Sequence, residues 1–191
     1  TFVKAWAATL AAALNARLPE DHWASPWFDF VGGGDEADYP TIIGPDGWPP
    51  PPTGVMTMPG GPSDTAEVRV FHDFGGRNLV GCVRFACPSN KAGAGERDAL
   101  GTVCAAMIRE MVSLVLVDVV TGPTGGLHPS VYRRLDPDAI PPLDSDLYAT
   151  AYCRPDEGSR SRVAVWARPL ALGGPLPTMP IRLRDAWLPV E

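Results

Sequence analysis

The fold is decided by residues 78–121, NLVGCVRFACPSNKAGAGERDALGTVCAAMIREMVSLVLVDVVT. Two nearly continuous apolar runs, 78–87 and 113–121, are typical of strands that are covered on both faces. The segment between them is predicted to be a helix, because Glu96 and Asp98 fall where acidic side chains stabilise a helix N-terminus. This order predicts a βαβ unit whose two strands are parallel neighbours in the centre of a sheet.

The chain before this unit predicts further elements of a mixed sheet. Apolar side chains that recur at i, i+4 predict an amphipathic helix over 2–17. Short strands are predicted at 27–33 and 38–44, and an alternating, half-buried strand at 66–74. The proline- and glycine-rich residues 44–63 are predicted to form a structured surface loop or a polyproline II docking segment.

The chain after the unit predicts a short helix and then strands. The helix is expected at 128–135, and residues 146–154 and 161–170 are expected to pair as an antiparallel hairpin. One or two edge segments are predicted within 178–191, so the C-terminal strands span 146–191. The whole is predicted to be one α/β domain, residues 1–191, with a mixed central sheet flanked by helices.

The acidic composition limits the classes of partner. The net charge is −6 and the pI is about 5.0, which argues against sequence-independent binding to nucleic acid. Arg160, Arg162 and Arg168 form either a local basic patch or a solvated strand face. No apolar run reaches the roughly 18 residues that a membrane helix needs, so no membrane partner is expected.

The cysteines indicate the compartment. Their positions have no Cys-x-x-Cys spacing and no histidine at ligand spacing, which argues against a zinc site built on them. They are too sparse for a disulfide framework, and most lie in apolar company. We therefore expect four reduced cysteines in a cytoplasmic protein: Cys82, Cys87, Cys104 and Cys153.

Several stretches, taken in their order and spacing, resemble the bacterial DUF4058 family, a domain of unknown function. They are LNARLPEDHWA (14–24), EVRVFHDFGGRNLV (67–80), CPSNK (87–91), LVLVDVVTG (114–122), LYATAY (147–152) and PLPTMPIRLRDAWLPVE (175–191). That family is related to the Uma-two-type proteins of the PD-(D/E)XK superfamily. The resemblance implies a restriction-endonuclease-like core, in which an aspartate and a glutamate on neighbouring strands bind magnesium and a lysine orients water.

When the family pattern is carried over residue by residue, this chain differs from it at the positions that the resemblance implies are catalytic. The first acid is Asp38, with Glu36 beside it, but the position of the glutamate is occupied by Arg84. In the turn that follows, Cys87 replaces a serine while three residues match: Pro88, Asn90 and Lys91. On the next helix the pattern has a lysine and a tyrosine, where this chain has Val103 and Met107.

Two interpretations of Arg84 follow. In the first, it forms an ion pair with Asp38 or Glu36 and an internal cation replaces the metal. In the second, it points to solvent. Lys91 is expected to be a turn lysine rather than a catalytic one.

The remaining candidate residues have weaker support. His72 and His128 have no evident catalytic triad, because no nucleophile motif accompanies them. Asp118, at the end of a strand, is expected to be a helix or loop cap rather than a catalyst.

The family-like scaffold with its glutamate replaced by Arg84 predicts a non-catalytic binding or assembly module without a cofactor. Its partner is expected to be an unidentified protein or a second copy of the same chain. The alternative is a magnesium-dependent nuclease with rearranged acids at Asp38, Glu36 and Glu67. A third class is an enzyme that acts on another phosphate ester or a small ligand in the same cleft.

Overall fold

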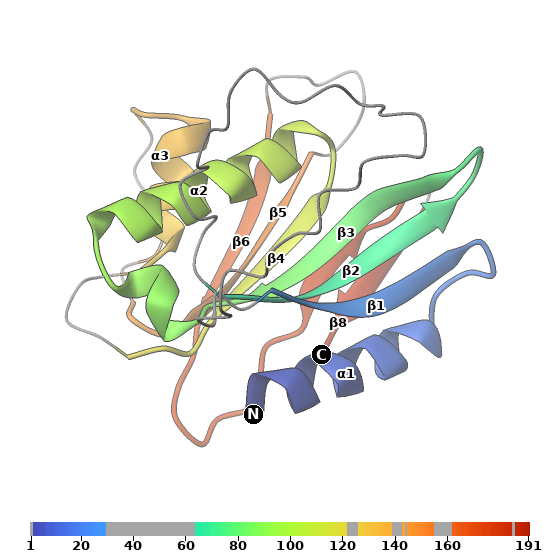
Figure 1. The fold of residues 1–191 in the computed structure, drawn as a ribbon, viewed down its shortest axis with the longest axis horizontal. Helices are drawn as coiled ribbons and strands as arrows, with labels where there is room; N and C mark the ends of the chain where they lie inside the picture. Colours follow the sequence, from blue (N-terminus) through green and yellow to red (C-terminus); the bar gives the residue numbers. More distant parts are fainter. Residues whose placement is uncertain are drawn as a thin grey trace, which may run out of the picture.

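The structure is a computed structural model that describes residues 2–29, 64–121, 126–138, 143, 145–154, 162–184 and 186–191. Its main feature is a twisted six-stranded sheet in the order β1-β2-β3-β4-β5-β6 (Figure 1). The strands are β1 (His22–Asp29), β2 (Thr65–Asp73), β3 (Arg77–Phe85), β4 (Ser113–Asp118), β5 (Tyr148–Cys153) and β6 (Ala164–Pro169). All neighbouring strands are antiparallel except β3 and β4, which are parallel.

The parallel pair at the centre confirms the predicted βαβ unit. Helix α2 (Ala94–Arg109) connects β3 to β4, and a short 3-10 helix, η1 (Pro88–Lys91), lies between β3 and α2. Every residue of β4 is buried, as a strand covered on both faces requires.

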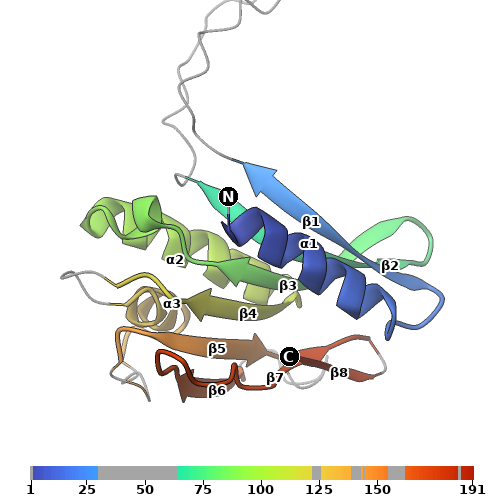
Figure 2. The same cartoon turned by 90° about the horizontal axis from the view of Figure 1, so that it is seen from below.

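Different elements cover the two faces of the sheet (Figures 1 and 2). Helices α2 and α3 (His128–Leu135) pack on one face, where Leu114 and Leu116 of β4 lie in their core cluster. Helix α1 (Phe2–Asn15) and the hairpin of β7 (Met179–Arg182) and β8 (Trp187–Val190) pack on the other, with Val115 and Val117. The alternation along β4 thus distributes apolar side chains to two cores.

The N-terminal predictions hold with shifted boundaries. Helix α1 ends at Asn15, two residues before the predicted end, and Asn15 hydrogen-bonds the backbone of Ala24 on β1. Strand β1 begins at His22 rather than at residue 27 and contains Pro26. Proline is tolerated because β1 is an edge strand, where one side has no ladder to complete. The predicted strand at 38–44 and the loop at 44–63 lie outside the described residues.

The C-terminal prediction is partly wrong. The antiparallel pairing of β5 with β6 is confirmed, but the last segments are not edge strands of the main sheet. Instead β7 and β8 pair with each other as a separate two-stranded sheet. The backbone N–H of Arg182 donates to Ser113 Oγ at 3.0 Å, which ties this hairpin to the start of β4. Ile181, Leu188 and their apolar neighbours fill the α1-side core, which a position at the sheet edge would leave uncovered.

Two further expectations can be compared with this part of the chain. All four cysteines are buried and free of disulfides, as predicted. Among the described residues, no helix combines the length and apolar character needed to cross a membrane.

Candidate functional site

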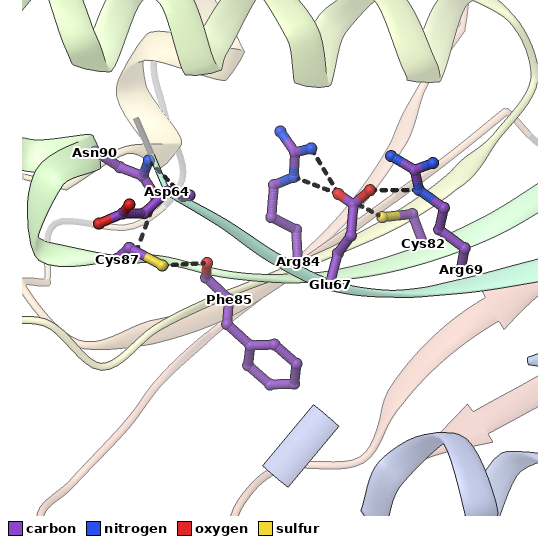
Figure 3. Close-up of polar contacts among 8 residues, drawn as sticks. All are labelled: Asp64, Glu67, Arg69, Cys82, Arg84, Phe85, Cys87 and Asn90. Atoms are coloured by element: carbon purple, nitrogen blue, oxygen red, sulfur yellow. Dashed lines mark hydrogen bonds and ion pairs between the residues drawn. The ribbon is translucent and has the colours of Figure 1, made fainter. Parts of the chain in front are cut away.

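The α2-side face of β2 and β3 carries a buried cluster of charged residues. Glu67 and Arg84 are direct cross-strand partners, and Arg69 lies two residues along β2 from Glu67. Arg84 donates to Glu67 Oε2 from Nε at 2.8 Å and from Nη2 at 2.5 Å. Arg69 Nε donates to the other oxygen, Oε1, at 2.5 Å. Figure 3 shows the two guanidinium groups on either side of the carboxylate, which has 0% of its side chain exposed.

The electrostatics of this cluster favour the charged forms of Glu67 and Arg84. Burial raises the pKa of Glu67, but Arg84 and Arg69 outweigh this effect and hold the pKa below its usual value. Burial lowers the pKa of Arg84, and its neighbours Cys104 and Glu67 raise it by more. The result is a desolvated carboxylate whose charge is neutralised inside the protein.

This geometry excludes the interpretation in which Arg84 points to solvent. Its side chain is 4% exposed and ion-paired, so it does not point to solvent. The structure shows Glu67 as its partner, which the alternative nuclease hypothesis names as a third acid. Asp38 and Glu36, the partners named from the resemblance, lie outside the described residues.

The described part of this cluster does not fit magnesium. A magnesium site needs open oxygen ligands in octahedral geometry, and both oxygens of Glu67 are occupied by arginines. Arg84 would also place a fixed positive charge beside the ion. On helix α2, the fully buried Cys104 interacts with Arg84, while Val103 and Met107 are half-buried.

The turn after β3 is held by its own side chains. The Cys87 N–H donates to Asn90 Oδ1 at 2.8 Å, and Asn90 Nδ2 donates to the carbonyl of Asp64 at 3.2 Å, which ties the turn to the residue before β2. Lys91 lies in this turn, as predicted, but its ammonium group is buried. Lys91 Nζ is 2.8 Å from Asp118 Oδ1 and donates to the carbonyl of Val120 at 2.5 Å.

Asp118 joins this turn to the end of β4. Its Oδ1 accepts a bond from the Val120 N–H at 3.2 Å, which confirms the predicted loop cap. Burial raises the pKa of Asp118, although Lys91 and Tyr148 act in the opposite direction. Lys91 and Asp118 therefore fasten the C-terminal ends of β3 and β4 to each other.

A chain of buried polar groups continues from this pair and was missed in the sequence. The His128 N–H donates to Tyr148 Oη at 2.6 Å, and His128 Nδ1 is hydrogen-bonded to the Tyr152 hydroxyl. Burial lowers the pKa of His128 from 6.5 to about 4, because desolvation disfavours the charged imidazole. The alternating Tyr-Ala-Thr-Ala-Tyr of β5 was a signal for this chain, because tyrosines spaced by two or four on a buried strand share one face.

A cavity of about 520 Å³ lies at a different edge of the molecule. Its wall includes Arg154, Arg182 and Arg184, while the acidic side chain described in the wall is Glu110. Arg154 Nη1 donates to the carbonyl of Arg109 at 2.8 Å. Arg154 Nε is buried and has no hydrogen-bond partner within the described part of the chain. An acceptor that entered this cavity would satisfy that N–H group.

No family model, curated protein or solved structure matches this chain. Function therefore has to be argued from the described side chains.

Proposed function

We propose that this protein is a non-catalytic binding or assembly module on a restriction-endonuclease-like scaffold. The observation that carries the proposal is the buried Arg84–Glu67–Arg69 cluster, at the position where the resemblance would put a metal-binding glutamate. The scaffold is supported by the parallel pair β3 and β4, by the α2 crossover and by the Asn90–Lys91 turn. The sequence resemblance to DUF4058 agrees with this proposal.

The alternative, a magnesium nuclease, requires more rearrangement. Glu67 would have to release both arginines to bind a cation. That release would leave the buried Arg84 guanidinium without its counter-ion, which costs several kcal/mol. A nuclease built on Asp38 and Glu36 alone would not need Glu67, so these two residues are where the proposal is tested.

The test is a calorimetric titration with magnesium together with a DNA cleavage assay. Magnesium is chosen because it prefers oxygen ligands and discriminates against imidazole sites. We expect no saturable binding above that of Asp38→Ala and no cleavage of single- or double-stranded DNA. Tight binding that Asp38→Ala abolishes, or cleavage that it abolishes, would establish the nuclease instead.

A small anion is the ligand that the cavity favours. Its wall holds three arginines and one glutamate within a chain of net charge −6, so the local charge opposes the overall charge. The unpartnered Arg154 Nε adds a donor in a partly desolvated place, where a charge-assisted hydrogen bond is strong. We infer that the module binds an oxyanion, such as a phosphate or carboxylate group, in this cavity.

Thermal unfolding in increasing inorganic phosphate tests this inference at constant ionic strength. A ligand that binds only the folded state raises the midpoint in proportion to the logarithm of its concentration once that concentration exceeds Kd, and tenfold excess over Kd adds about 1.4 kcal/mol. We expect this rise in the unmodified protein and in Arg168→Gln, whose exposed side chain is not part of the cavity wall. Arg184→Gln should reduce it. Equal responses in all three proteins would exclude a phosphate site in the cavity.

A further inference from the structure

Two histidines and an aspartate meet at one end of the β1–β2 pair. His22 and His72 are direct cross-strand partners, and Asp21 immediately precedes β1. Asp21 Oδ1 is 2.6 Å from His22 Nδ1, and Asp21 Oδ2 is 3.0 Å from His72 Nε2. One ligand atom from each of these residues lies within 4.8 Å of the others. The carboxylate is thus held between two imidazole nitrogens.

The backbone around this cluster is fixed from several sides. The Asp73 N–H donates to the carbonyl of Asp21 at 2.8 Å, and the His22 N–H donates to the carbonyl of Pro19 at 2.9 Å. The rings of His22 and His72 are 4.6 Å apart, so each restricts the other. Their side chains are 6% and 9% exposed, while that of Asp21 is 55% exposed. The imidazoles are therefore positioned by the sheet, and the carboxylate faces solvent.

We propose that Asp21, His22 and His72 form a binding site for a divalent transition metal of the zinc class. Imidazole nitrogen and carboxylate oxygen are the ligands that zinc takes at about 2.0–2.2 Å. His22 Nδ1 and His72 Nε2 are already in hydrogen-bond contact with the Asp21 carboxylate. The three side chains therefore need only a small outward shift to share one ion at that distance. The ion would replace the protons that now join the three groups.

The coordination number follows from the number of ligands. Three protein ligands leave one position of a tetrahedral zinc site open, and open positions are typical of sites that hold water or a ligand. The exposed Asp21 provides an entry path from solvent. His72 also lines the cavity of about 520 Å³ described above, so a bound ion would add positive charge to the wall of that cavity. The metal site does not depend on the proposed function, because it uses neither Arg84 nor Glu67.

The ligand set excludes the hard cations and favours the later first-row metals. Magnesium and calcium prefer oxygen ligands, whereas two imidazoles suit zinc, cobalt, nickel and copper. A hydrogen-bonded His–Asp–His cluster without a metal is the competing explanation, and the following test separates the two.

The experiment is a titration of chelator-treated protein with zinc by calorimetry and with cobalt by visible absorption. We expect one ion per chain, with the absorption bands of a nitrogen- and oxygen-ligated cobalt. Asp21→Asn should weaken zinc binding at least tenfold, and His72→Gln should weaken it further. Glu20→Gln is the matched control, because it removes the same charge from the neighbouring exposed residue and should leave the affinity unchanged.

Three outcomes would overturn the proposal. The first is absence of stoichiometric zinc binding in the unmodified protein. The second is equal affinity in Asp21→Asn and Glu20→Gln, which would show that only general acidic charge attracts the ion. The third is a thiolate-to-cobalt charge-transfer band, which would place the ion on the cysteines. Asp21 is exposed, so its variant should fold even if His72→Gln does not.

Discussion

Replacement of Glu67 by glutamine is expected to lower the free energy of unfolding by about 3–5 kcal/mol. The substitution keeps the shape of the side chain but removes its charge, so Arg84 stays buried beside a neutral group. Small domains have only about 5–15 kcal/mol of stability in total, so this loss is large. Denaturant unfolding of Glu67→Gln, with the exposed Glu20→Gln as control, measures it.

A double variant shows how much of this loss comes from the unpaired arginine. We expect Arg84→Met in the Glu67→Gln background to recover most of the loss, because an apolar side chain of similar length needs no counter-ion. A loss in Glu67→Gln no larger than that in Glu20→Gln would contradict the buried ion pair.

The stability difference between the unmodified protein and Glu67→Gln should depend on pH in a defined direction. The pKa of Glu67 is lowered in the folded state from its ordinary value of 4.5, so its contribution is fully present above that value. It is lost as the pH falls through the lower folded pKa. The stability difference between the unmodified protein and Glu67→Gln should therefore shrink in strong acid.

His128 is expected to destabilise the protein in mild acid. Burial lowers its pKa from 6.5 to about 4, so the unfolded chain takes up a proton before the folded protein does. Stability should fall as the pH drops below 6.5 and should stop falling, for this residue, below about 4. The shift corresponds to about 3 kcal/mol lost by pH 4.

Two measurements isolate this residue from the other groups that titrate. Unfolding free energies of the unmodified protein and of His128→Gln are compared between pH 7 and pH 4. The unmodified protein should lose about 3 kcal/mol more. If His128→Gln folds poorly, the pKa of His128 is measured directly by NMR titration. A pKa near that of a free histidine would contradict the buried, neutral imidazole.

The elements that could be predicted are those whose signal is local. Strands β3 and β4 are continuous apolar runs, and α2 lies between them with Glu96 in its first turn. Each signal depends on residues close together in sequence, so packing elsewhere did not change it. Helix α1 was predicted for the same reason.

The partner of Arg84 could not be predicted because it depends on strand register. Glu67 and Arg69 alternate with Val68 and Val70, which is the pattern of a strand with one face in solvent. In the structure this face is not exposed to solvent, and Glu67 is fully buried. The register of β2 with β3 also shifts between Val70 and Phe71, and no local pattern indicates such a shift.

The Asp21–His22–His72 cluster was missed for a related reason. His72 was noted, but its partners are Asp21, just before β1, and His22, the first residue of β1. The pairing of β1 was not predicted, and this strand was expected to start later. Metal-ligand spacing is recognisable in sequence when the ligands share one helix or turn. Here two ligands come from neighbouring strands, so only the pairing of β1 with β2 brings them together.

The position of the β7–β8 hairpin has a consequence for how the chain reaches this structure. Its apolar residues share one core with Ala7, Leu10 and Leu14 of α1, from the other end of the described chain. Contacts between residues so far apart form only after a large loop closes, and proteins dominated by such contacts fold slowly. Until the hairpin docks, Val115, Val117 and their neighbours in the central strands stay exposed. Because residues 179–190 are synthesised after the central strands, we expect a sheet without the docked hairpin to expose apolar surface and to be prone to aggregation.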